Sequence, residues 1–189
     1  MKLGVFAMIP QLNTKVLNGN LTKRQNIRFQ KSKVKTMLVC FYDDKGIIHH
    51  EFVPEGQNVT GSFYLSVLEH LWKRIRRVRP EDSAPGSWFL LHDNPPVHRA
   101  VAVQEFLAWK QVCVLHQPSY SPDLYPCDYF MFPKLKLPLK GCLFEDVQDL
   151  QAPVTSNLWA IPQEDMQRSF QFLLDRATGC IDAEGMYSE

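Results

Sequence analysis

Two aspartates, Asp93 and Asp128, are the residues in this sequence best placed to carry out chemistry. Asp93 directly follows residues 88–91, an apolar run short enough to be a buried strand. A second apolar run, 112–115, leads into the loop that carries Asp128. Carboxylates beyond the ends of neighbouring strands suit Mg²⁺ or Mn²⁺, and two such ions about 4 Å apart can drive phosphodiester cleavage. By pattern alone, an isolated aspartate after a strand more often shapes a turn or caps a helix than binds a metal.

The elements that must position these carboxylates follow the order of an α/β fold. Two strand-like runs are separated by the turn 43–46 and predict a hairpin. Thr60 is a predicted N-cap for the helix that follows. The expected architecture is a mixed sheet flanked by helices, in one domain over residues 35–189. The predicted strands are 34–42, 47–53, 88–91 and 112–115, and the predicted helices are 60–79, 99–110, 129–135, 147–159 and 163–177.

The first 34 residues differ in character from the rest of the chain. No Asp or Glu precedes Asp43. Residues 3–9 are apolar at successive positions, as in a central strand that is buried on both faces. Residues 10–34 are polar, basic and unpatterned, and we expect them to form a loop or arm.

Basic side chains indicate where a nucleic acid would bind. One group lies near the end of the basic segment and the other in the second half of the predicted helix 60–79. Phosphate contact explains both groups, while a solubilising tail and the preference of cations for helix C-termini explain them equally well. The candidate DNA-binding residues are Lys31, Lys33, Lys35, Arg74, Arg76 and Arg77.

Composition excludes several other classes of protein. The five cysteines include no CxxC pair, so the sequence supports neither a zinc ribbon nor a disulfide framework. We therefore expect reduced thiols inside a cell. No stretch reaches the roughly 20 apolar residues of a membrane helix, so no membrane association is expected. The formal net charge of +1 says little about partners.

Two segments of the sequence resemble mariner transposases, in the mariner and Tc1 group. His92-Asp93-Asn94 with Pro96 and His98 is similar to the family's HDNAPxH segment, and residues 120–130 are similar to its YSPDLAPxDY segment. The 34 residues between Asp93 and Asp128 match the spacing of the family's last two catalytic aspartates. The resemblance covers roughly residues 30–189.

The resemblance implies an RNase H-like fold and cut-and-paste DNA chemistry with Mg²⁺. Asp93 and Asp128 are then the catalytic metal ligands, and His92 and Asn94 are expected to fix a turn. His98 is expected to cap a helix. The resemblance also implies a nuclear location, with DNA as partner and pairing with a second copy or with related transposases.

One part of the family pattern is missing from the sequence. The family's first catalytic aspartate lies on the central strand, about ninety residues before the HDN segment, and nothing here matches it. Asp43 and Asp44 occupy the hairpin turn, where aspartate is common for its own backbone hydrogen bonds. We expect residues 3–9 to replace the lost strand, so that the sheet survives and the metal site does not.

The sequence therefore predicts a truncated, transposon-derived protein with impaired catalysis and non-specific DNA binding. One alternative is a metal-dependent endonuclease whose site is completed by another residue or by a partner. A second alternative is a relict that does not fold by itself.

Overall fold

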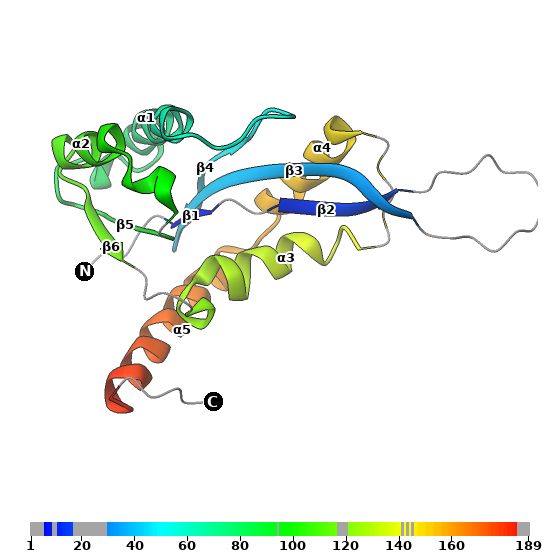
Figure 1. The fold of residues 1–189 in the computed structure, drawn as a ribbon. Helices are drawn as coiled ribbons and strands as arrows, with labels where there is room; N and C mark the ends of the chain where they lie inside the picture. Colours follow the sequence, from blue (N-terminus) through cyan, green and yellow to red (C-terminus); the bar gives the residue numbers. More distant parts are fainter. Residues whose placement is uncertain are drawn as a thin grey trace, which may run out of the picture.

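A six-stranded sheet forms the centre of the computed structural model (Figure 1). The structure describes residues 6–8, 11–16, 30–93, 95–116, 121–140, 142, 144 and 146–184, with side chains from Thr36 onward. The strand order is β2-β3-β1-β5-β6, and β4 pairs with β3 outside this path. The strands are β1 (Phe6–Met8), β2 (Gln11–Val16), β3 (Gln30–Asp43), β4 (Gly46–Phe52), β5 (Phe89–His92) and β6 (Cys113–His116).

The short strand β1 lies in the middle of the sheet. It pairs antiparallel with β3, with Phe6 opposite Tyr42, and parallel with β5, with Phe6 opposite Leu91. The prediction that residues 3–9 supply a central strand is therefore confirmed over Phe6–Met8, while 3–5 and 9 lie outside the described residues. Without this strand, β3 and β5 would have no common neighbour.

The predicted loop over residues 10–34 is wrong at both ends. Residues Gln11–Val16 form β2, which pairs antiparallel with β3, and β3 begins at Gln30 rather than at 34. The alternation of Leu12, Thr14 and Val16 with polar residues is a strand pattern, hidden by the basic composition around it. A polar strand at the edge of a sheet needs only a partner for its backbone hydrogen bonds, and β3 is long enough to provide one.

Helices cover both faces of the sheet (Figure 1). The first two pack on one core, where α1 contacts both α2 and β4, and side chains of the last three line the core on the other face. Thr60 caps α1 as predicted, since its hydroxyl oxygen accepts from the Phe63 N–H at 3.2 Å. The helices are α1 (Gly61–Val78), α2 (Val101–Trp109), α3 (Phe132–Lys136), α4 (Val147–Trp159) and α5 (Gln163–Asp182).

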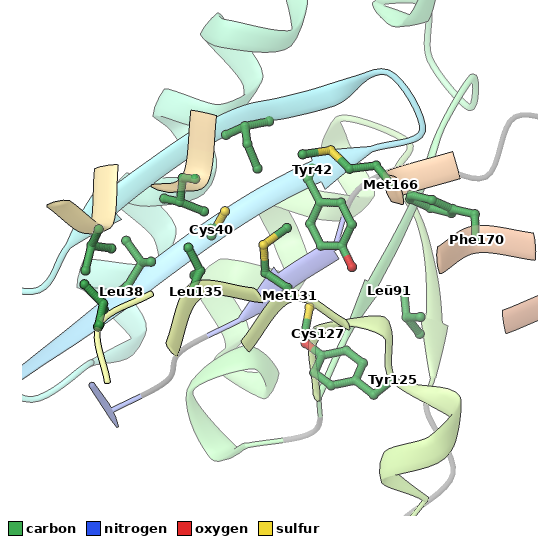
Figure 2. Close-up of a cluster of buried hydrophobic side chains, with 14 of the residues drawn as sticks. Leu38, Cys40, Tyr42, Leu91, Tyr125, Cys127, Met131, Leu135, Met166 and Phe170 are labelled. Atoms are coloured by element: carbon green, nitrogen blue, oxygen red, sulfur yellow. The ribbon is translucent and has the colours of Figure 1, made fainter. Parts of the chain in front are cut away.

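Strand β3 separates two hydrophobic cores because its side chains alternate between the faces. Val39 and Phe41 face the core beneath α1 and α2. Cys40 and Tyr42 face the core beneath α3, α4 and α5 (Figure 2). All four are at most 1% exposed. Burial on both faces fixes the register of β3, since a slip of one residue would exchange the two sets of side chains.

None of the described helices is long and apolar enough to cross a membrane.

Candidate metal and nucleic-acid site

Asp93 lies just beyond the carboxyl end of β5, as the sequence predicted. Its side chain is half-exposed, but its Oδ1 atom is buried and makes no hydrogen bond among the described residues, although Nδ1 of His98 lies 3.3 Å from it. Burial raises the pKa of this carboxyl above its ordinary value. A buried carboxylate oxygen that makes no hydrogen bond is a costly arrangement, and a bound cation would relieve that cost.

Asp128 is the second residue of a π-helical turn, Cys127–Met131, that follows the proline-rich loop. Its backbone N–H donates to the Tyr125 carbonyl at 2.9 Å, which holds the start of this turn against the end of the loop. Partial burial raises the pKa of Asp128, and the negative charge of Asp93 raises it further. The fold therefore brings the two predicted carboxylates into electrostatic contact, although 34 residues separate them in sequence.

A stack of three aromatic rings holds Asp93 in place from the α1 side of the sheet. The His98 ring lies 4.0 Å from the Tyr64 ring and 4.5 Å from the His92 ring, measured between centroids. The Tyr64 hydroxyl lies 3.1 Å from Nδ1 of His92. His98 donates from Nδ1 to the backbone carbonyl of Asp93 at 2.9 Å, because a carbonyl can only accept. The imidazole thus fixes the chain at the carboxylate.

The prediction that His98 caps a helix is wrong. Ala100 occupies the N-cap position of α2 and makes no side-chain cap. His98 lies in the preceding 3-10 segment, Pro96–Arg99, where it is 1% exposed and reaches inward instead. Burial lowers the pKa of His98 to about 4 and that of His92 to about 3. Asn94, the other neighbour of Asp93, lies outside the described residues.

The register of the sheet identifies where a third carboxylate would belong. Ala7 pairs with His92 in the parallel β1–β5 pair, so position 8 is level with Asp93. The residue there is Met8, which pairs with Cys40 on its other side. A methionine has a soft thioether and no oxygen, so it does not suit the hard ions Mg²⁺ and Mn²⁺. The residues present fit a divalent-metal site with two carboxylates.

Asp43 does not fill this gap, because both its carboxylate oxygens are used elsewhere. It is 6% exposed, and Arg79 donates to both of them, from Nε at 2.7 Å and from Nη2 at 3.0 Å. The backbone N–H groups of Lys45 and Gly46 donate to its Oδ1, each at 2.9 Å. Asp43 therefore closes the β3–β4 turn and ties it to the end of α1, as expected for a turn aspartate.

The predicted DNA-binding residues fall into two separate places. Positions 31, 33 and 35 belong to β3, where it pairs with β2, and not to a loop. Arg74 and Arg77 line a cleft of about 420 Å³ between β4, α1 and α4, while Arg76 is exposed on α1. Arg74 also donates from Nε to the Ile48 carbonyl at 3.2 Å. The lining of the cleft is completed by Ile48, His49, His50, His70, Lys73 and Trp159.

Sequence reasoning missed the residues of this cleft that are not lysine or arginine. Three histidines and Trp159 come from three elements far apart in the chain, so no local motif groups them. The sequence did offer one signal. His49 and Glu51 are two residues apart in a predicted strand, so their side chains are expected on the same face. Their partner His70 lies on α1, and only the packing of α1 against β4 brings it near.

Comparison with known proteins gives a consistent result. The family model described as Transposase (partial DDE domain) matches residues 16–84. The Mariner Mos1 transposase of Drosophila mauritiana is 32% identical over 169 residues, which is 89% of this chain and 48% of that protein. The chain thus spans about half the length of this relative.

Solved structures match over the whole chain. A structure of the Mos1 transposase catalytic domain and Raltegravir with Mg has a TM-score of 0.81 and 28% identity, and the match covers 86% of that chain. A Mos1 transposase paired-end complex with left transposon end has a TM-score of 0.84 and 26% identity, with 57% of that chain covered.

The fold and the pair of carboxylates define an RNase H-like domain of the transposase type. Within this class, the sequence relative and the matching structures both point to mariner transposases. The chain is a mariner transposase catalytic-domain-like protein.

Proposed function

We propose that this chain is a transposon-derived DNA-binding domain that holds Mg²⁺ through Asp93 and Asp128 and cleaves DNA poorly. The observation that carries the proposal is the buried Oδ1 of Asp93, which makes no hydrogen bond among the described residues, beside a second carboxylate of raised pKa. The matched structure of the Mos1 catalytic domain with Mg supports the choice of ion. A bound ion would activate a water and stabilise the leaving oxygen of a phosphodiester.

The impairment follows from the number of carboxylates. Asp93 and Asp128 supply two, and the level position on β1 holds Met8. Two-metal catalysis needs both ions to stabilise the in-line displacement, and with two carboxylates the second ion is poorly held. His92 and His98 remain neutral at physiological pH, so they position Asp93 without competing as cations for it.

Non-specific DNA binding is the second part of the proposal. The basic side chains that support it are those of Lys31, Lys33, Lys35, Arg74, Arg76 and Arg77. Affinity for duplex DNA should fall linearly with salt on logarithmic axes, because each phosphate contact releases counterions. An affinity that is unchanged by salt contradicts this part of the proposal. A nuclear location and association with a second copy or a related transposase are consistent with DNA as the partner.

Metal titration tests the site directly. We expect Mg²⁺ or Mn²⁺ to raise the melting temperature of the parent protein, and more so with DNA present. Asp93→Ala and Asp128→Ala should lose that increase. In metal-free buffer Asp93→Asn should melt above the parent at neutral pH: a carboxyl with a raised pKa destabilises the fold as pH rises through that pKa. If Mg²⁺ or Mn²⁺ raises the melting temperature of both alanine variants as much as that of the parent, the proposed site is wrong.

A gain-of-function variant tests the cause of the impairment. Met8→Asp adds a carboxylate level with Asp93, and we expect it to convert a protein that nicks plasmid DNA poorly into one with efficient Mg²⁺-dependent nicking. Ala7→Asp is the matched control, because it adds the same charge one residue away, at the position paired with Phe41 in the opposite core. If the parent already nicks as efficiently as Met8→Asp and Asp93→Ala abolishes the activity, the endonuclease alternative is correct.

A further inference from the structure

Two histidines and a glutamate converge outside the Asp93 site. Glu51 accepts through Oε1 from Nε2 of His49 at 2.6 Å and from Nδ1 of His70 at 2.8 Å. The three atoms all lie within 4.8 Å of one another. From this geometry we propose that His49, Glu51 and His70 form a zinc site that joins β4 to α1.

The fold, rather than a local motif, assembles these ligands. His49 and Glu51 are two residues apart on β4 and therefore share one face of the strand. His70 comes from the middle of α1, which packs across that face. The His49 and His70 rings meet edge to face with their centroids 6.3 Å apart, and the Phe41 ring stacks on His49 from within the core at 6.4 Å. The two elements that carry the ligands are thus held by the core.

The donor set selects zinc over magnesium. Imidazole nitrogens with a single carboxylate oxygen suit Zn²⁺, whereas Mg²⁺ takes oxygen ligands and keeps several waters. Tetrahedral zinc with bonds of about 2.1 Å places its ligand atoms about 3.4 Å apart. Shifts on the order of 1 Å would bring the three atoms to that spacing. Such shifts are accessible, because the His70 side chain is 52% exposed.

The surroundings exclude general attraction of cations as the means of binding. Lys73, Arg74 and Arg77 line the cleft beside the cluster, so its electric field repels a loosely held cation. A cation bound there must be held by the ligand atoms themselves. Three protein ligands leave a fourth position on zinc, which water can occupy. The expected consequence of binding is a cross-link between strand and helix that raises thermal stability.

Zinc titration of tag-free protein with blocked thiols tests the proposal. Blocking is necessary because Cys113 and Cys142 are exposed and could bind zinc themselves. We expect calorimetry to detect one Zn²⁺ per chain and the melting temperature to rise. Co²⁺ should give visible bands of a nitrogen- and oxygen-ligated ion. Loss of an outer-shell partner already weakens metal sites by about 10- to 100-fold, so Glu51→Gln should weaken zinc binding by more than about 100-fold.

Matched variants separate this site from its neighbours. His50→Asn removes an imidazole one residue along β4, where the ring contacts Trp159 instead, and should leave zinc affinity unchanged. Asp93→Ala should also leave it unchanged, which keeps this test independent of the proposed Mg²⁺ site. The proposal is overturned if the parent shows no zinc-induced rise in melting temperature. It is equally overturned if Glu51→Gln and His70→Ala bind zinc as the parent does.

Discussion

Acid should unfold this chain through two buried imidazoles. His92 and His98 are 2% and 1% exposed, and burial lowers the pKa of these rings from 6.5 to about 3 and about 4. In the unfolded chain both rings titrate near 6.5, so below that pH the unfolded state binds protons that the folded state does not. The stability that depends on neutral rings is complete above about pH 6.5 and is lost as pH falls toward the folded-state values.

The magnitude follows from the width of this window. A proton bound only by the unfolded state changes the free energy of unfolding by about 1.4 kcal/mol per pH unit. Between about pH 6.5 and pH 5, each ring therefore removes about 2 kcal/mol, and the two together about 4 kcal/mol. Domains of this kind are stable by about 5–15 kcal/mol, so the loss is a large fraction of the total. Urea unfolding followed by circular dichroism at about pH 8 and pH 5 measures it.

His98→Asn is the informative variant for this prediction. Its side-chain amide can still donate to the Asp93 carbonyl but does not titrate, so the loss between about pH 8 and pH 5 should be halved. The double variant with His92→Asn should lose almost nothing over the same range. Asp93 and Asp128, whose pKa values are raised, act in the opposite direction and are common to every protein compared. A parent protein equally stable at both pH values would refute the reasoning, and so would a double variant that keeps the full loss.

Three substitutions test the framework around the site by urea unfolding at neutral pH. Asp43→Ala should lower the free energy of unfolding by about 3 kcal/mol, because it leaves the Arg79 charge partly buried and two turn N–H groups without their acceptor. A loss below about 1 kcal/mol would mean that the Asp43–Arg79 pair contributes no more than a solvent-exposed ion pair. Thr60→Ala should cost about 1 kcal/mol through the lost cap on the Phe63 N–H, and Thr60→Ser should restore most of it. Leu150→Ala should cost about 2–5 kcal/mol, since Leu150 is 0% exposed, and an unchanged midpoint would show that α4 is not docked.

Local sequence determined much of the framework. Alternating and helical hydrophobic periods identified the β3–β4 hairpin and the helices α1 to α5, because burial of one face leaves a periodic trace in the residues. The Thr60 cap was also readable, since an N-cap needs only a side-chain oxygen within one turn. The strand β2 was missed because backbone hydrogen bonds with β3 hold it in the sheet. Such pairing does not require a regular pattern of apolar residues.

The sequence by itself determined which carboxylates belong together, and the tertiary structure decided what surrounds them. Asp93 and Asp128 stood out by residue type and spacing; Asp93 lies just beyond the end of β5, and Asp128 lies at the start of a π-helical turn. That Met8 is level with Asp93 depends on the register of β1, and that His98 faces inward depends on Tyr64 and His92. Both arrangements depend on contacts between residues that are distant in the chain. Such contacts produce no periodic pattern in the local sequence from which they could be predicted.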